Sequence, residues 1–141
     1  MNKLTLPTLT IDGRTVVIEG ERNLLELVRK AEIDLPTFCY HSELSVYGAC
    51  RLCLVQVDGR GVMGACSTPP EPGLKIQTTT PEIREIRRIA VELLLANHDQ
   101  QCPTCPRSTN CQLQSLAQRL GIRKVRFRPV HQPVPLDESS P

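Results

Sequence analysis

The seven cysteines of this 141-residue chain constrain its fold more than any other feature, because they fall into two clusters. The clusters are Cys39, Cys50, Cys53 and Cys66, and then Cys102, Cys105 and Cys111. The chain has no Trp, two Phe and two Tyr, so it lacks the large aromatic side chains that usually anchor a core. Small cores of this kind are often stabilised by disulfides or metals.

Disulfides are the poorer explanation of these cysteines, because an odd number of them cannot pair completely within one chain. Residues 1–9 hold one Lys and no long apolar run, so they do not read as a signal peptide. No stretch approaches the roughly 18 apolar residues needed to cross a bilayer. We therefore expect a cytoplasmic protein with no direct membrane span, whose thiols bind metal.

Residues 1–78 are expected to form a compact α+β domain. Strands are predicted at Thr8–Ile11, Thr15–Glu19, Leu52–Val57, Gly61–Ala65 and Leu74–Thr78. Asp12-Gly13 between the first two runs predicts a tight hairpin turn. Asn23 is a candidate N-cap for a helix over Leu24–Ala31, whose apolar residues fall on one face.

Residues 79–128 are expected to form a small, mainly helical second domain, followed by an extended tail or linker over 129–141. Thr80 and Pro81 predict the start of a helix whose second half, apolar nearly all round, should be buried. After a polar loop, a further helix is predicted over Cys111–Leu120, ending at Gly121.

The first cysteine cluster has the pattern Cys-x10-Cys-x2-Cys-x12-Cys. Soft thiolates are the ligands that iron–sulfur clusters, zinc and copper(I) select. Plant-type ferredoxins hold a 2Fe–2S cluster through one loop cysteine, a Cys-x2-Cys pair and a distant fourth, and this spacing follows the same order with a wider first gap. A zinc site is the alternative, although structural four-cysteine zinc sites commonly pair two short knuckles and only one is present here.

Residues Gly48 and Ala49 place little bulk just before Cys50, where the backbone would approach inorganic sulfide. Main-chain N–H groups aimed at such a cluster would tune its reduction potential. Arg51 either adds a positive charge there or is an ordinary exposed side chain.

The second cysteine cluster is preceded by a histidine, in the pattern His-x3-Cys-x2-Cys-x5-Cys that begins at His98. Pro103 and Pro106 each follow a cysteine and stiffen the loop. Neutral imidazole in place of thiolate removes one negative charge, which should make reduction easier, as in Rieske centres. A zinc site with three cysteines and one histidine is the alternative. His41 and His131 have no such neighbours and are not candidate ligands.

Taken together, these motifs resemble one family. They are Phe38–Leu44 (FCYHSEL), Gly48–Val57 (GACRLCLVQV), Cys66 and His98–Cys111 (HDQQCPTCPRSTNC). The chain resembles, over roughly residues 8–128, the N-terminal region shared by the large iron–sulfur subunit of NADH dehydrogenase (respiratory complex I) and the catalytic subunit of NADH-linked iron-only hydrogenases. NAD-dependent formate dehydrogenases and the small diaphorase-side subunit of NAD-reducing hydrogenases are similar.

The resemblance implies a β-grasp 2Fe–2S ferredoxin-like domain over residues 1–78 and a 4Fe–4S module after it. It implies that the 2Fe–2S cluster is held by Cys39, Cys50, Cys53 and Cys66. It implies that the 4Fe–4S cluster is held by His98, Cys102, Cys105 and Cys111. No catalytic residue is expected in this chain.

The resemblance also implies an electron relay within a hetero-oligomeric, NAD(H)-linked oxidoreductase that is cytoplasmic, or peripheral to the membrane in a respiratory complex. Its expected partners are a flavin- and NAD(H)-binding subunit with its own iron–sulfur clusters and a catalytic or ferredoxin-type subunit. The chain has no Gly-x-Gly-x-x-Gly after a strand with which to bind dinucleotide itself. Longer relatives continue into further clusters, so this chain is expected to be either a fragment or a short relay subunit.

The alternative function is a zinc-stapled module that binds nucleic acid or protein. Its basis is the basic segment Arg119–Arg128, which contains no acidic residue and could neutralise phosphates. Aromatic side chains for base stacking are nearly missing there, with only Phe127 present. A solvated basic surface, or one that faces an acidic partner subunit, fits the segment better, so no nucleic-acid partner is expected.

Overall fold

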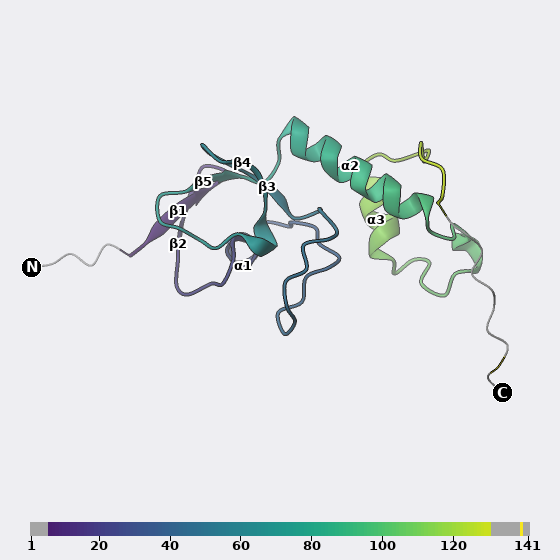
Figure 1. Cartoon of the computed structure of the whole chain (residues 1–141), viewed down its shortest axis with the longest axis horizontal. Helices are drawn as coiled ribbons and strands as arrows, with labels where there is room; N and C mark the ends of the chain where they lie inside the picture. Colours follow the sequence, from purple (N-terminus) through teal and green to yellow (C-terminus); the bar gives the residue numbers. More distant parts are fainter. Residues whose placement is uncertain (1–5, 131–138, 140–141) are drawn as a thin grey trace, which may run out of the picture. The chain divides into compact units, whose positions relative to one another are not determined.

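A computed structural model of the chain describes residues 6–130 and residue 139 (Figure 1). The chain divides into two compact units, Met1–Ala90 and Val91–Pro141. The boundary between them falls inside one long helix. Most of the expected tail over 129–141 lies outside the described residues.

The first unit is built on a five-stranded mixed sheet with the order β2-β1-β5-β3-β4. The strands are β1 (Thr8–Ile11), β2 (Arg14–Val17), β3 (Leu54–Val57), β4 (Gly61–Gly64) and β5 (Lys75–Gln77). β1 and β5 run parallel, whereas the other neighbouring pairs are antiparallel. All five predicted strands are present, most of them a little shorter than expected, and the predicted α+β fold is confirmed.

The turn between β1 and β2 shows why Asp12-Gly13 predicts a hairpin. Asp12 has φ +47° and Gly13 has φ +82°, so both central residues adopt the left-handed conformation of a type I′ turn. The Asp12 carboxylate also accepts hydrogen bonds from the main-chain N–H (2.8 Å) and the hydroxyl (2.6 Å) of Thr78. The turn therefore holds the end of β5 as well as joining its own two strands.

Helix α1 (Leu24–Lys30) supplies the other half of the core. Asn23 caps it as predicted, because its Oδ1 accepts the N–H of Glu26 at 3.0 Å. The helix buries four apolar residues against side chains from alternate positions of the strands, which point to one face of the sheet. This core comprises Leu9, Ile11, Leu24, Leu25, Leu27, Val28, Leu35, Cys53, Val55, Val57, Ala65, Cys66 and Ile76. Two of the candidate ligands, Cys53 and Cys66, therefore belong to the core itself.

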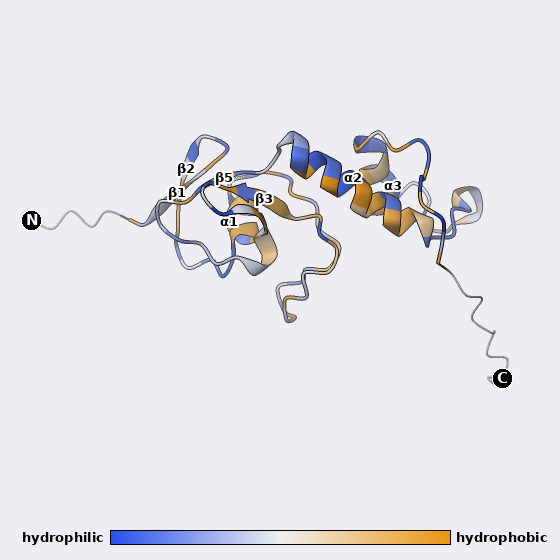
Figure 2. Ribbon diagram, turned by 45° about the horizontal axis from the view of Figure 1, so that its top comes forward, coloured by the Kyte–Doolittle hydropathy of each residue, from blue (hydrophilic) through white to orange (hydrophobic). Residues whose placement is uncertain are grey.

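Helix α2 (Pro81–Ala96) begins as predicted, with the Thr80 hydroxyl accepting the N–H of Ile83 at 3.1 Å. Its hydrophobic residues are concentrated in its second half (Figure 2). The expectation that this half is buried all round is wrong. Val91 and Ala96 are buried, but Leu93 and Leu94 are 47% and 40% exposed, because the described residues of the second unit leave these two side chains partly uncovered.

A buried arginine, Arg87, holds the first half of α2 to the sheet. Its guanidinium donates to the main-chain carbonyls of Leu52 (2.7 Å), Leu54 (2.7 Å) and Thr78 (2.9 Å). Leu52 lies between the candidate ligands Cys50 and Cys53. Arg87 thus fixes the backbone at the start of β3, on which the pair of cysteines depends.

The second unit contains the end of α2, the short 3-10 helix η2 (Cys102–Thr104) and helix α3 (Gln112–Arg119). α3 ends in a Schellman motif at the predicted residue, since Gly121 has φ +67° and its N–H donates to the carbonyl of Gln118, while Ile122 donates to Ala117. Glu92 is fully buried and accepts a 2.7 Å bond from Nε of Arg126, so this basic residue stabilises the unit. No helix in the described part of the chain is long and apolar enough to span a bilayer.

We predict that Arg87→Met lowers the free energy of unfolding by about 2–4 kcal/mol, because it leaves buried carbonyls without their donor. Urea denaturation followed by circular dichroism measures the effect. Arg84→Met is the matched control, since Arg84 lies on the same helix but is exposed; its change should stay within about 0.5 kcal/mol. Equal effects of the two substitutions would contradict the role of Arg87.

Candidate metal centres

The first candidate centre is formed by four cysteines from three segments of the first unit. Cys39 lies in the segment after α1, Cys50 and Cys53 precede β3, and Cys66 lies in the 3-10 helix η1 (Ala65–Ser67) that follows β4. Cys53 and Cys66 are 3% and 2% exposed, whereas Cys39 and Cys50 are half-buried. The Ala65 N–H donates to the carbonyl of Cys53 at 2.9 Å and ties two of the segments together.

Main-chain N–H groups already point at the sulfur atoms of this centre. The N–H of Cys50 donates to Sγ of Cys39 at 3.4 Å, and the N–H of Phe38 donates to Sγ of Cys50 at 3.4 Å. The hydroxyl of Thr37 lies 3.8 Å from the same Cys50 sulfur. Donors in these positions stabilise the negatively charged thiolate, and the thiolate is the form of cysteine that binds a metal.

The electrostatics of the four thiols are strongly linked. Burial raises the pKa of the Cys66 thiol, and its hydrogen bond to Cys53 and the nearby Cys53, Cys39 and Cys50 raise it further, to about 12. Burial also raises the pKa of Cys50, but the N–H groups of Phe38 and Leu52 and the hydrogen bonds with Cys39 outweigh it, and the pKa lies below its ordinary value. Cys53, Cys39 and Cys50 are thus close enough to Cys66 to disfavour its thiolate, and positive metal charge would favour the thiolate form that binding requires.

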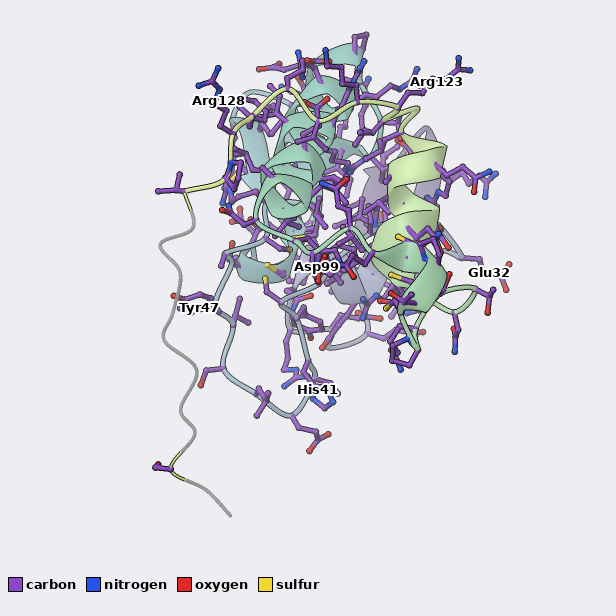
Figure 3. All side chains as sticks on the ribbon, turned by 90° about the vertical axis from the view of Figure 1, so that its right-hand side faces the viewer. Glu32, His41, Tyr47, Asp99, Arg123 and Arg128 are labelled. Carbon is purple, nitrogen blue, oxygen red and sulfur yellow. The ribbon has the colours of Figure 1, made fainter. Side chains whose placement is uncertain are left out.

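The loop between Cys39 and Cys50 is anchored at its base and exposed at its tip. The Tyr40 hydroxyl donates to Glu26 at 2.8 Å and accepts from Asn23 at 3.2 Å, which holds the residue after Cys39 on α1. Beyond this point the loop extends away from the sheet (Figure 1). His41 is exposed on it and accepts the N–H of Glu43 at 3.1 Å through Nδ1 (Figure 3).

Two residues beside Cys50 adopt left-handed backbone conformations. Gly48 has φ +69° and Arg51 has φ +55°. No described atom outside its neighbours lies within 4 Å of the position that a Cβ on Gly48 would take. The positive φ, rather than the lack of bulk expected from the sequence, therefore explains why glycine occupies position 48.

The second candidate centre is a loop between α2 and α3 in the second unit. His98 follows α2, and its N–H donates to the carbonyl of Leu95 at 3.2 Å. Cys102 begins η2, and the N–H of Cys105 returns to its carbonyl at 3.2 Å. Cys111 caps α3, with its Sγ accepting the N–H of Gln114 at 3.5 Å. Local turns and a helix cap therefore orient these residues, in contrast to the core that orients the first centre.

A cavity of about 580 Å³ opens between the end of α2 and α3, and the candidate ligands His98, Cys102 and Cys111 line it together with apolar side chains such as Leu95 and Leu113. Cys105 is half-buried and is not among the lining residues. In the part of the chain that the structure describes, no three His, Cys, Asp or Glu side chains are arranged to share a single metal ion. The ligand assignments at both centres thus stay predictions.

Three structural contributions had no clear signal in the sequence. The Arg87 contacts and the Glu92–Arg126 pair join residues far apart in the chain, and the Tyr40 anchor joins Cys39 to the capping residue of α1. A buried charge in an apolar helix face was the only hint available for Arg87 and Glu92.

Comparison with known proteins assigns both regions. Residues 7–81 match the family described as a 2Fe–2S iron–sulfur cluster binding domain, and residues 87–126 match the NADH-ubiquinone oxidoreductase-G iron–sulfur binding region. The chain is 38% identical over 123 residues to the mitochondrial 78 kDa subunit of NADH-ubiquinone oxidoreductase from Neurospora crassa. It is 35% identical over 127 residues to the NADP-reducing hydrogenase subunit HndD from Solidesulfovibrio fructosivorans.

These matches cover 86% of this chain in each case, but only 16% of the Neurospora protein and 22% of the Solidesulfovibrio protein. A solved structure, that of an NAD+-reducing NiFe-hydrogenase in the H2-reduced state, is similar with a TM-score of 0.84 at 32% identity. That match covers 96% of this chain and 57% of the hydrogenase chain.

The donor sets, the fold and both matched regions agree with each other, and nothing found supports the zinc alternative. The chain has one region for a 2Fe–2S cluster and one for a 4Fe–4S cluster. It belongs to the family of 2Fe–2S iron–sulfur cluster binding domains, here joined to the iron–sulfur binding region of the NADH-ubiquinone oxidoreductase G subunit.

Proposed function

We propose that this chain relays electrons through its two centres, with Cys39, Cys50, Cys53 and Cys66 as ligands of the 2Fe–2S cluster and His98, Cys102, Cys105 and Cys111 as ligands of the 4Fe–4S cluster. The observation that carries this proposal is the geometry of the first centre: Cys53 and Cys66 lie in the core, and main-chain N–H groups are directed at the sulfurs of Cys39 and Cys50. When bound, the clusters supply one-electron carriers. The protein supplies ligands, burial and hydrogen bonds.

The cavity between α2 and α3 supports the second proposed ligand set, because residues from both ends of the loop line it. His98 belongs to this set because it lines the cavity with Cys102 and Cys111. As a neutral ligand it would make the centre less negative than four thiolates would, which favours the reduced form.

The proposed electron donor or acceptor on one side is a flavin- and NAD(H)-binding subunit with iron–sulfur clusters of its own. The similar proteins are named for different overall reactions, with ubiquinone in one and hydrogen in others, but all are named for a nicotinamide nucleotide. A segment common to these proteins is best suited to exchange electrons with the part of each complex that reacts with the nicotinamide nucleotide. The other side would be a catalytic or ferredoxin-type subunit.

An exposed apolar surface beside the first centre supports contact with such a partner. On the loop between Cys39 and Cys50, Leu44 is 69% and Tyr47 is 82% exposed, and the Tyr47 side chain points outward (Figure 3). Grouped exposed apolar residues commonly mark protein interfaces. The hetero-oligomer would be cytoplasmic, or peripheral to the membrane in a respiratory complex.

We predict that anaerobically purified protein contains about six iron and six sulfide per chain and gives two distinct reduced signals in electron paramagnetic resonance. Cys53→Ser should remove the 2Fe–2S signal and leave the other, because serine is a poor ligand for these clusters. Cys105→Ser should do the reverse. Each variant serves as the control for the other.

The outcome that would overturn the function is zinc bound without acid-labile sulfide after iron–sulfur reconstitution. Loss of both signals in Cys105→Ser, with the first unit still folded, would instead refute the separation of the two ligand sets.

We further predict that His98→Cys retains a 4Fe–4S cluster but lowers its midpoint potential, because a thiolate adds negative charge to the ligand shell. Redox titration followed by electron paramagnetic resonance measures the shift. His41→Cys is the control, since His41 belongs to neither proposed set, and it should leave both potentials unchanged. An unshifted potential in His98→Cys would show that the histidine is not a ligand.

A further inference from the structure

We propose that Arg51 is a charge-tuning residue of the first centre: its guanidinium lies near Gly64, on the strand that leads to Cys66, and raises the reduction potential of the 2Fe–2S cluster. This inference rests on the proposed ligand set of Cys39, Cys50, Cys53 and Cys66. It goes beyond that set because Arg51 itself binds no metal.

The backbone at Arg51 is the first observation. Its φ of +55° lies in the left-handed region, where a side chain other than glycine costs roughly 1 kcal/mol. Glycine would adopt this angle freely, as Gly48 does at φ +69° three residues earlier in the same loop. An arginine at such a position is unfavourable for the backbone, which indicates a use for its side chain.

The location of the guanidinium is the second observation. Nη1 of Arg51 lies 3.8 Å from the position that a Cβ on Gly64 would occupy. Gly64 ends β4 two residues before Cys66, and its carbonyl accepts the hydroxyl of Thr68 at 2.8 Å. The side chain of Arg51, which lies between Cys50 and Cys53 in sequence, therefore reaches the end of β4, two residues before Cys66.

The lack of a counter-charge is the third observation. Arg22, Lys30 and Arg60 of the same unit each pair with a carboxylate within 2.9 Å. For Arg51, no carboxylate partner is found among residues 6–130. Its positive charge is thus available to the centre, where reduction adds one negative charge. An adjacent cation stabilises the reduced state and raises the potential.

The side chain of Arg51 is exposed, so dissolved salt must weaken this effect. The screening length falls from about 30 Å at 0.01 M to about 3 Å at 1 M ionic strength. Salt dependence of the potential therefore separates a charge effect from a change in the packing of the loop.

The test measures the midpoint potential of the 2Fe–2S cluster in the whole loaded protein with Arg51→Met, Arg51→Gly and Arg51→Lys. Arg51→Met removes the charge but keeps the backbone cost, whereas Arg51→Gly removes both. We expect both to lower the potential by similar amounts and Arg51→Lys to stay near the wild-type value. The differences should shrink as ionic strength rises. Arg14→Met, which removes an exposed charge from β2, should change nothing.

The proposal is overturned if Arg51→Met keeps the wild-type potential at low salt, or if Arg51→Gly shifts it and Arg51→Met does not. The latter result would assign the effect to the backbone. If one Arg51 variant does not bind the 2Fe–2S cluster, the potentials of the other two variants test the proposal. Failure of the proposed function is separate, because wild-type protein would then contain no iron–sulfur signal at all.

Discussion

The proximity of four cysteine thiols is the constraint on which the first unit depends: the N–H of Cys50 donates to Sγ of Cys39, and Cys53, Cys39 and Cys50 all act on the pKa of Cys66. Burial and the nearby Cys53, Cys39 and Cys50 raise the pKa of Cys66, so the Cys66 thiolate is unfavourable without a metal. Positive metal charge would stabilise the thiolates, and the N–H groups of Phe38 and Cys50 add to the stabilisation of Cys50 and Cys39. The arrangement is therefore suited to a metal–sulfur group more than to free thiols.

The core and this centre share residues, because Cys53 and Cys66 lie within the hydrophobic cluster that joins α1 to the sheet. A substitution that disturbs the packing of Val55 or Ala65 would also displace a ligand. Arg87 extends the same coupling to α2, since it holds the carbonyls of Leu52 and Leu54 on either side of Cys53. Stability of the fold and geometry of the ligands are not separable here.

Local signals in the sequence predicted the helices and strands well, but contacts between residues distant in sequence could not be predicted from it. Asn23, Thr80 and Gly121 act within one helical turn, so residue type alone indicates their capping roles. The Glu92–Arg126 pair spans 34 positions, and no periodic pattern predicts which basic residue of Arg119–Arg128 pairs with Glu92. Burial of Leu93 and Leu94 was wrongly expected because an apolar run does not reveal how many sides of a helix are covered.

The two candidate centres differ in how their ligands are held, and this difference follows from burial. In the first, core packing positions the proposed ligands Cys53 and Cys66 through contacts distant in sequence. In the second, Cys102 and Cys111 depend on a 3-10 turn and a helix cap, which are short-range and partly exposed. Local hydrogen bonds of this kind contribute little net stability each. With the proposed ligands, metal binding would therefore order the second loop more than the first, because the free energy of binding contributes to folding where the site is not formed beforehand.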